Sequence, residues 1–167
     1  PEETLWRINQ LLDAASKTLK NTSVLFLTPG TSHIFRLKEN GRIVSNCHKL
    51  PGTRFDSSIL KPELIIAQWK AALEALWRIN PALKVVFSVS PVRYFAFGHY
   101  ENSVSKVHLF TAIYALQEMY PGLCYFPAYL MVMDDLRDYR FYNADMLHPN
   151  SVAINYVWQA IRTHLID

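Results

Sequence analysis

The chain has 167 residues, of which 50% are hydrophobic and 19% are charged, a composition that suits a compact globular domain and argues against intrinsic disorder. The formal net charge of +3 comes from scattered Lys and Arg side chains, so no basic stripe indicates a nucleic-acid partner. No apolar run approaches the roughly 20 residues of a membrane span, so no membrane partner is expected. Cys47 and Cys124 are too few for a disulfide framework, and we expect a reducing, cytoplasmic location.

Helices and strands alternate along the predicted fold. Apolar residues at helical spacing predict three long helices, over residues 4–20, 62–80 and 103–119. Short apolar runs between them predict three strands buried on both faces, over residues 24–27, 85–89 and 123–126. In the third helix, we expect the inward face to consist of Val104, Val107, Phe110, Ile113 and Leu116. This alternation is typical of an α/β fold with a parallel sheet covered by helices on both faces.

The segment after the first strand departs from this alternation. Asn40-Gly41 is a strong turn signal between two β-prone runs, so a hairpin excursion is expected near residues 33–57 of a single domain that spans residues 1–167. Three strands make a small sheet, and the first helix has no strand before it. We therefore expect the fold to be incomplete at its N-terminus, and a homodimer to form through the sheet edge that this leaves exposed.

A polar loop near the C-terminus carries a candidate acid–base pair. Asp145 precedes His148 by three residues, so its carboxylate can fold back, accept the ring N–H and leave the other ring nitrogen free as a base. Pro149 and Asn150 end this loop and begin a helix, because Asn is a favourable N-cap residue. The spacing alone is weak, since it arises by chance in a chain with six histidines. Because the pair lies just before a capped helix, we take an acid–base role in acyl-transfer chemistry as a hypothesis for Asp145 and His148.

A serine hydrolase also needs a nucleophile and an oxyanion hole. Gly30 and its neighbours follow the first predicted strand and are candidates for backbone N–H donors to an oxyanion. Ser32 and Ser90 each follow a predicted strand, but neither lies in a Gly-x-Ser-x-Gly elbow. The simpler interpretation is that both hydroxyls cap loop turns.

Other kinds of site have weaker support. A metal site would have to combine residues whose spacing matches no ligand signature: His33, Cys47, His48, His99 and His148. An anion could bind near residues 137–142, although Arg and Tyr side chains in such a pattern more often brace a surface. No Gly-x-Gly-x-x-Gly follows a strand, which sets aside a dinucleotide fold. We expect neither a metal nor a cofactor.

Five phrases carry a family resemblance: Asn46-Cys47-His48-Lys49-Leu50-Pro51; Val89-Ser90-Pro91-Val92-Arg93; Glu101-Asn102-Ser103 with Ser105-Lys106; Tyr125-Phe126-Pro127; and Asp135-Leu136-Arg137-Asp138-Tyr139-Arg140-Phe141-Tyr142 with Asp145-Met146-Leu147-His148-Pro149. Together they resemble the GSCFA-domain family over essentially the whole chain. That family is similar to the SGNH (GDSL-type) hydrolases.

The resemblance implies a flavodoxin-like, three-layer α/β/α fold with a serine esterase-type site, in which Asp145 and His148 are the acid and base of the triad. Oxyanion or substrate contacts are expected from Gly30, Thr31, Ser32, Ser90, Arg93 and His48. The motif Gly-Ser-Cys-Phe-Ala, which would hold the nucleophilic serine, does not occur in this sequence. The oxyanion Asn of the SGNH hydrolases also has no match in the loop at residues 28–32.

These features together predict an SGNH-like hydrolase domain that acts on a small-molecule or glycan acyl ester and has little activity as this chain alone. The alternative is a non-catalytic α/β domain that binds a carbohydrate or a protein.

Overall fold

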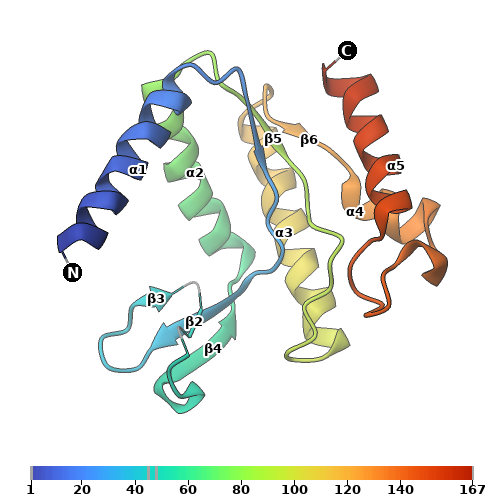
Figure 1. The fold of residues 1–167 in the computed structure, drawn as a ribbon, viewed down its shortest axis with the longest axis horizontal. Coiled ribbons are helices and arrows are strands. Elements are labelled where there is room, and N and C mark those ends of the chain that lie inside the picture. Colours follow the sequence, from blue (N-terminus) through green and yellow to red (C-terminus); the bar gives the residue numbers. More distant parts are fainter. Residues whose placement is uncertain (1, 45, 48, 167) are drawn as a thin grey trace.

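A computed structural model of the protein describes residues 2–44, 46–47 and 49–166. Its parallel sheet has the order β1-β5-β6, formed by Val24–Leu27, Lys84–Phe87 and Cys124–Tyr125. The main helices are α1 (Glu2–Lys20), α2 (Pro62–Ile79), α3 (His99–Met119) and α5 (Ser151–Ile161) (Figure 1). Shorter helical segments are Gly52–Arg54 and Tyr139–Phe141 (both 3-10), α4 (Ala128–Leu130), and the π-helical turns Met131–Asp135 and Arg162–Ile166.

Helices pack on both faces of the parallel sheet. Val85 and Phe87 of β5 face α2 and α3, where they join a core with Leu73, Leu109 and other buried residues. The residue between them, Val86, faces the opposite side and packs in a second cluster that includes the end of α5. Successive strand residues point to opposite faces, so one strand contributes to both clusters. The expected three-layer α/β/α arrangement is confirmed.

A second, antiparallel sheet follows β1, as the turn signal predicts. Its order is β3-β2-β4, from Ile43–Val44, His33–Leu37 and Phe55–Ile59. Gly41 has φ 69°, the left-handed conformation that glycine adopts readily at a tight turn. Strand β4 was not predicted, because Phe-Asp-Ser-Ser-Ile has no sustained apolar pattern. Five residue pairs along β2 hold it in the sheet.

Three predictions of burial are wrong. In the third strand, predicted to be buried on both faces, Cys124 of β6 is exposed. Strand β1 is not buried on both faces: Val24 and Phe26 are 37% and 38% exposed, because β1 is an edge strand in the described sheet and no described helix covers these two side chains there. Val107, expected to face inward, is 58% exposed. Helix α3 instead turns Ser105 and Lys106 into the protein, where loop backbone supplies their partners.

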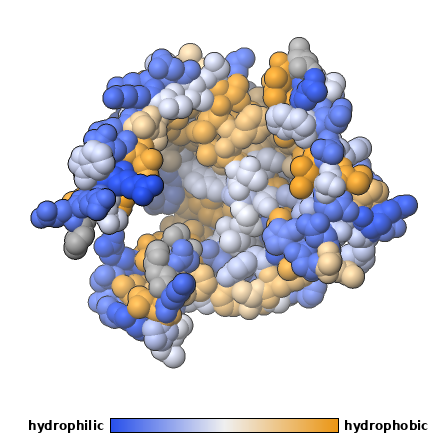
Figure 2. Space-filling model, viewed as in Figure 1, coloured by the Kyte–Doolittle hydropathy of each residue, from blue (hydrophilic) through white to orange (hydrophobic). Residues whose placement is uncertain are grey.

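Helix α1 touches the core mainly at its end. Leu19 packs against the main core, and the Asn80 amide donates to the carbonyls of Leu19 and Thr22. Earlier in the helix the apolar side chains are exposed, among them Leu5, Trp6, Ile8, Leu11 and Leu12. Hydrophobic side chains also gather on the central part of the face shown in Figure 2. Within the described part of the chain, no helix is both long and apolar enough to span a bilayer.

Candidate functional site

The loops that carry the predicted site residues lie at one edge of the parallel sheet. The loops after β1 and β5 and the loop before α5 all lie toward the lower side of Figure 1. Backbone pairing continues beyond the strands, because Ser88 N–H donates to Leu27 O and Ser90 N–H donates to Pro29 O. The loops at residues 28–32 and 88–93 therefore run side by side. This is the edge at which open α/β sheets hold ligands.

Asp145 and His148 form a close pair in their loop. His148 Nδ1 lies 2.6 Å from Asp145 Oδ2. Asp145 Oδ1 accepts from the backbone N–H groups of His148 at 3.0 Å and Leu147 at 2.9 Å. Hydrogen bonds from these two backbone N–H groups and from the ring lower the pKa of Asp145 to about 2. The carboxylate is therefore charged at neutral pH, and we assign the Nδ1–H tautomer to His148 on that basis.

This loop is fixed to the start of α5. Asn150 caps the helix, because its Oδ1 accepts from Val152 N–H at 3.1 Å and from Ala153 N–H at 3.2 Å. Its Nδ2 donates back to Arg140 O at 2.7 Å. Met146 occupies the left-handed region with φ 56°, which lets the chain reverse between the acid and the base. A local turn and a helix cap thus hold the pair in register.

A pocket of about 380 Å³ opens beside Asp145. It is lined by Arg93, Phe95, His99, Tyr139, Asp145, Met146 and Leu147. The Arg93 guanidinium lies 5.4 Å above the Tyr142 ring and 3.6 Å from Met133 Sδ. No described carboxylate is within ion-pair distance of Arg93. The pocket therefore combines aromatic side chains with one cation, Arg93, and one carboxylate, Asp145, which are not within ion-pair distance of each other.

Two consecutive side chains of α3, which we call the Ser105–Lys106 clamp, fasten the loops at the strand ends. Lys106 Nζ donates to Gly30 O and Ser90 O, each at 2.6 Å, and to Val92 O at 3.0 Å. Ser105 Oγ accepts from Ser32 N–H at 2.7 Å. Both side chains are buried, at 1% and 2% exposure.

Ser105-Lys106 is part of a phrase that carries the family resemblance, but its burial and its contacts with the loops were not predicted, although one signal pointed to them. Lys106 lies three residues before Leu109 and seven before Ile113, which places all three on one helix face.

The predicted loop residues are distributed around the clamp. Gly30 and Ser90 offer their carbonyls to Lys106, and Thr31 Oγ1 lies 2.9 Å from Ser105 Oγ. Ser32 is buried, and both its N–H and its hydroxyl bond to Ser105.

The two serine hydroxyls that were candidates for a nucleophile take part in loop contacts. Ser90 Oγ accepts from Val92 N–H at 3.3 Å, a turn-capping contact, and the Ser32 hydroxyl donates to Ser105. His48, also predicted to contact substrate, lies outside the described residues.

Another buried side chain lies next to these loops. The ring of His33 stacks on Phe97 at 4.6 Å between centroids and lies 5.6 Å from Tyr94. Its Nε2 is 3.9 Å from a Glu101 carboxylate oxygen, and burial lowers its pKa. Among the described residues, no group of three or more His, Cys, Asp or Glu side chains is arranged to hold a metal ion.

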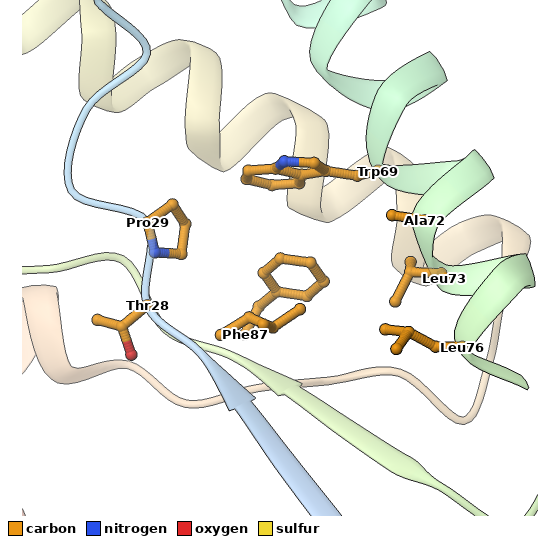
Figure 3. A pocket seen from close by; sticks show the side chains of 8 residues that line it. Thr28, Pro29, Trp69, Ala72, Leu73, Leu76 and Phe87 are labelled. Atoms are coloured by element: carbon orange, nitrogen blue, oxygen red, sulfur yellow. The ribbon is translucent and has the colours of Figure 1, made fainter. Parts of the chain in front are cut away.

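An apolar cavity of about 310 Å³ adjoins the loop after β1, at Thr28 and Pro29. Trp69 of α2 stacks above Phe87 of β5, with ring centroids 4.9 Å apart (Figure 3). The remaining lining is aliphatic, from Leu27, Ala72, Leu73 and Leu76. The cavity is therefore lined almost entirely by apolar side chains.

Comparison with known proteins agrees with the resemblance seen in the sequence. No curated protein matches the chain at a significant level. The family model described as the GSCFA family matches residues 1–161, almost the full length of the sequence. The chain therefore belongs to the GSCFA family.

Proposed function

We propose that the chain supplies the acid and base of an SGNH-like serine hydrolase that cleaves small-molecule or glycan acyl esters. The observation that carries this proposal is the contact of 2.6 Å between His148 Nδ1 and Asp145 Oδ2 in a loop at the strand-end edge. With Nδ1–H donated to the carboxylate, Nε2 holds the lone pair that a general base needs. No hydrogen bond joins Nε2 to another described residue, so it remains open to a reacting group.

In the proposed reaction, His148 Nε2 takes the proton of a serine hydroxyl as that oxygen attacks the acyl carbonyl. Asp145 stays ionised and stabilises the imidazolium. The imidazolium then gives its proton to the leaving alcohol oxygen as the ester C–O bond breaks. Water activated by the same nitrogen hydrolyses the acyl-serine and regenerates the free hydroxyl.

We propose that the nucleophilic serine is supplied by a segment other than these 167 residues, because the motif Gly-Ser-Cys-Phe-Ala does not occur in them. No described serine hydroxyl makes a hydrogen bond with His148, and the hydroxyls of Ser32 and Ser90 are engaged in loop contacts. A serine nucleophile works only with its base in hydrogen-bond reach. The 167-residue chain alone should therefore show no burst of product from an activated ester.

The experiment compares this chain with the longest product of its gene on a short-chain nitrophenyl ester. In the longer product we expect esterase activity that His148→Ala lowers by at least roughly 10³-fold. Lys61→Ala, an exposed change at the start of α2, is the matched control. A longer product without His148-dependent activity, or burst release from the short chain, contradicts the proposal.

The pocket beside Asp145 favours a second candidate function, the binding of a carbohydrate without catalysis. Phe95, His99 and Tyr139 line this pocket, so a sugar bound there would contact aromatic rings, and the Arg93 guanidinium could donate hydrogen bonds to its oxygens. Isothermal titration with acidic and neutral oligosaccharides tests this function. Binding that Tyr139→Ala abolishes, in a gene product without esterase activity, would favour it.

We also infer self-association through the open edge of β1. In the described sheet, the outer edge of β1 has unpaired backbone groups that another strand can pair with. The side chains of Val24 and Phe26 are also exposed and could be covered by a second copy. Light scattering should give a mass that rises with concentration, and Phe26→Lys should keep the chain monomeric. A wild-type monomer at high concentration contradicts this inference.

A reducing, cytoplasmic location also remains a proposal, supported by the free thiols of Cys47 and Cys124.

A further inference from the structure

His33 is a buried histidine whose ring makes no hydrogen bond. Its side chain is 2% exposed, and it occupies the first position of β2. Neither Nδ1 nor Nε2 has a hydrogen-bond partner in the described part of the chain. A Glu101 carboxylate oxygen lies 3.9 Å from Nε2, which is too far for a hydrogen bond. Buried polar atoms without partners lower stability, so hydrogen bonding does not explain an imidazole at this position.

Aromatic rings on the loop between β5 and α3 pack against this imidazole. The Phe97 ring stacks on it, with centroids 4.6 Å apart and planes 16° apart. The Tyr94 ring lies 5.6 Å from it at an angle of 56°. Phe97 also lies 6.3 Å from Phe35, which is two positions along β2 and therefore on the same face of that strand. These ring contacts join the loop to the antiparallel sheet.

Other side chains of the same loop line the pocket of about 380 Å³ described above. Arg93 and Phe95 belong to the lining of that pocket. Their neighbours Tyr94 and Phe97 instead contact the imidazole. A movement of the loop away from the antiparallel sheet would therefore also move part of the pocket wall.

Protonation disfavours the buried position of His33. A neutral imidazole can lie among aromatic rings, whereas an imidazolium loses the water that would hydrate its charge. Burial therefore lowers the pKa of His33, and the Glu101 carboxylate of α3 raises it by less. Tyr94 is the titratable group that the loop places beside the ring, and Ile59, opposite His33 on β4, is apolar. Acid thus favours a form in which the ring is hydrated.

We propose that His33 is a proton-sensitive latch for the loop at residues 94–98. In its neutral form it packs with Tyr94 and Phe97 and holds the loop against the antiparallel sheet. On protonation the ring leaves this packing, and the loop opens together with the pocket wall at Arg93 and Phe95. The proposal concerns the conformation of this loop and does not rest on the hydrolase function.

Hydrogen exchange of two backbone amides, followed by NMR, tests the latch. Tyr94 N–H donates to Asn102 Oδ1 at 2.9 Å, and Gly98 N–H donates to Phe95 O at 3.0 Å. Exchange is corrected for its intrinsic dependence on pH. Below 6.5, the ordinary pKa of histidine, the equilibrium constant for opening should then rise by up to about tenfold per pH unit. In His33→Phe, which keeps a ring but takes up no proton, this rise should be absent.

Two other variants complete the experiment. Glu101→Gln removes the charge that favours the imidazolium, so the rise between about pH 7 and pH 5 should be steeper than in the wild type. His164→Phe, which replaces an exposed histidine, is the matched control and should keep the pH dependence of the wild type.

Three results overturn the proposal. They are equal protection of the two amides at about pH 7 and pH 5, greater protection in acid, and a pH dependence that survives in His33→Phe. If His33→Phe does not fold, titration of the ring itself in the wild type, followed by the NMR signals of its carbon-bound protons, replaces that variant. The ring should titrate below 6.5, and titration at or above that value also overturns the proposal.

Discussion

The Asp145–His148 loop and the Ser105–Lys106 clamp lie at the same edge of the sheet but are built in opposite ways. The loop is exposed, and its bonds join residues two or three positions apart. The clamp is buried, and its bonds join α3 to residues up to 76 positions away in sequence. A local turn can form as soon as its own residues meet, whereas the clamp requires the sheet and α3 to be assembled.

Because the loop is exposed and the clamp is buried, we expect the loop to matter for catalysis and the clamp for the stability of the fold. Removing a side chain of the exposed loop leaves its partners accessible to water, so the fold loses little. Removing a side chain of the clamp leaves buried donors or acceptors without partners, so the fold should lose stability. We therefore expect substitutions in the clamp to change unfolding most, and substitutions in the loop to change proton transfer most.

The largest effect on stability is expected for Lys106→Met. Three carbonyls lose their donor, while removal of a buried charge offsets part of that loss, so the free energy of unfolding should fall by about 3 kcal/mol. Urea denaturation measures the change, with Lys70→Met as the control that should stay within about 0.5 kcal/mol of the wild type. Equal stability of the two variants would mean that the clamp does not support the loops.

Ser105→Ala should have the next largest effect. It removes the acceptor of Ser32 N–H and the partner of Thr31 Oγ1, which should lower the free energy of unfolding by about 2 kcal/mol. Ser103→Ala, two positions earlier, removes only an exposed bond to His99 O and serves as the matched control. If both variants unfold at the same urea concentration, the buried hydroxyl contributes nothing specific.

Asn150→Asp tests the junction between the loop and α5. Aspartate keeps the oxygen that caps the helix but loses the donor to Arg140 O, so stability should fall by about 1 kcal/mol. Asn21→Asp, which alters an exposed amide after α1, should change stability by less. Thermal unfolding of the two variants measures the difference. A larger loss of stability in Asn21→Asp would show that the bond from Asn150 to Arg140 O does not stabilise this junction.

The smallest effect on global stability is expected from titration of Asp145. Its folded pKa of about 2 is below the unfolded value, so the stabilisation by this carboxylate is complete above about pH 4 and is lost as pH falls toward 2. The backbone amides of Leu147 and His148 should report the change by NMR. In Asp145→Asn these amides should not titrate over that range. Titration near pH 4 in the wild type would show that the bonds are weak in solution.

Local signals in the sequence predicted the acid–base loop and most of the elements. The Asp145 to His148 spacing, the Asn150 cap and the proline at the start of α2 all act within a few residues, and the structure contains each contact or boundary. Burial of polar residues was not predictable in this way. The hydrophobic periodicity predicted that Val107 faces inward, but Lys106 is the buried residue instead. Periodicity could not show this, because the carbonyls that accept from Lys106 come from loops distant in the sequence.

The exposure of β1 also depends on assembly. An apolar run such as Val24–Leu27 is common to central and edge strands, so sequence alone cannot assign its place in a sheet. The triad roles of Asp145 and His148 came from the family resemblance, and they remain proposals that the experiments above test.

The left-handed turn at Met146 has a consequence for handling the protein. That turn holds a methionine side chain, 56% exposed, on the rim of the pocket beside Asp145. Thioethers in such positions are readily oxidised to sulfoxides, which are polar and chiral. Peroxide would thus convert an apolar edge of the pocket into a hydrogen-bond acceptor next to a carboxylate. The ligand affinity of aged protein would then depend on how much of the Met146 sulfur is oxidised.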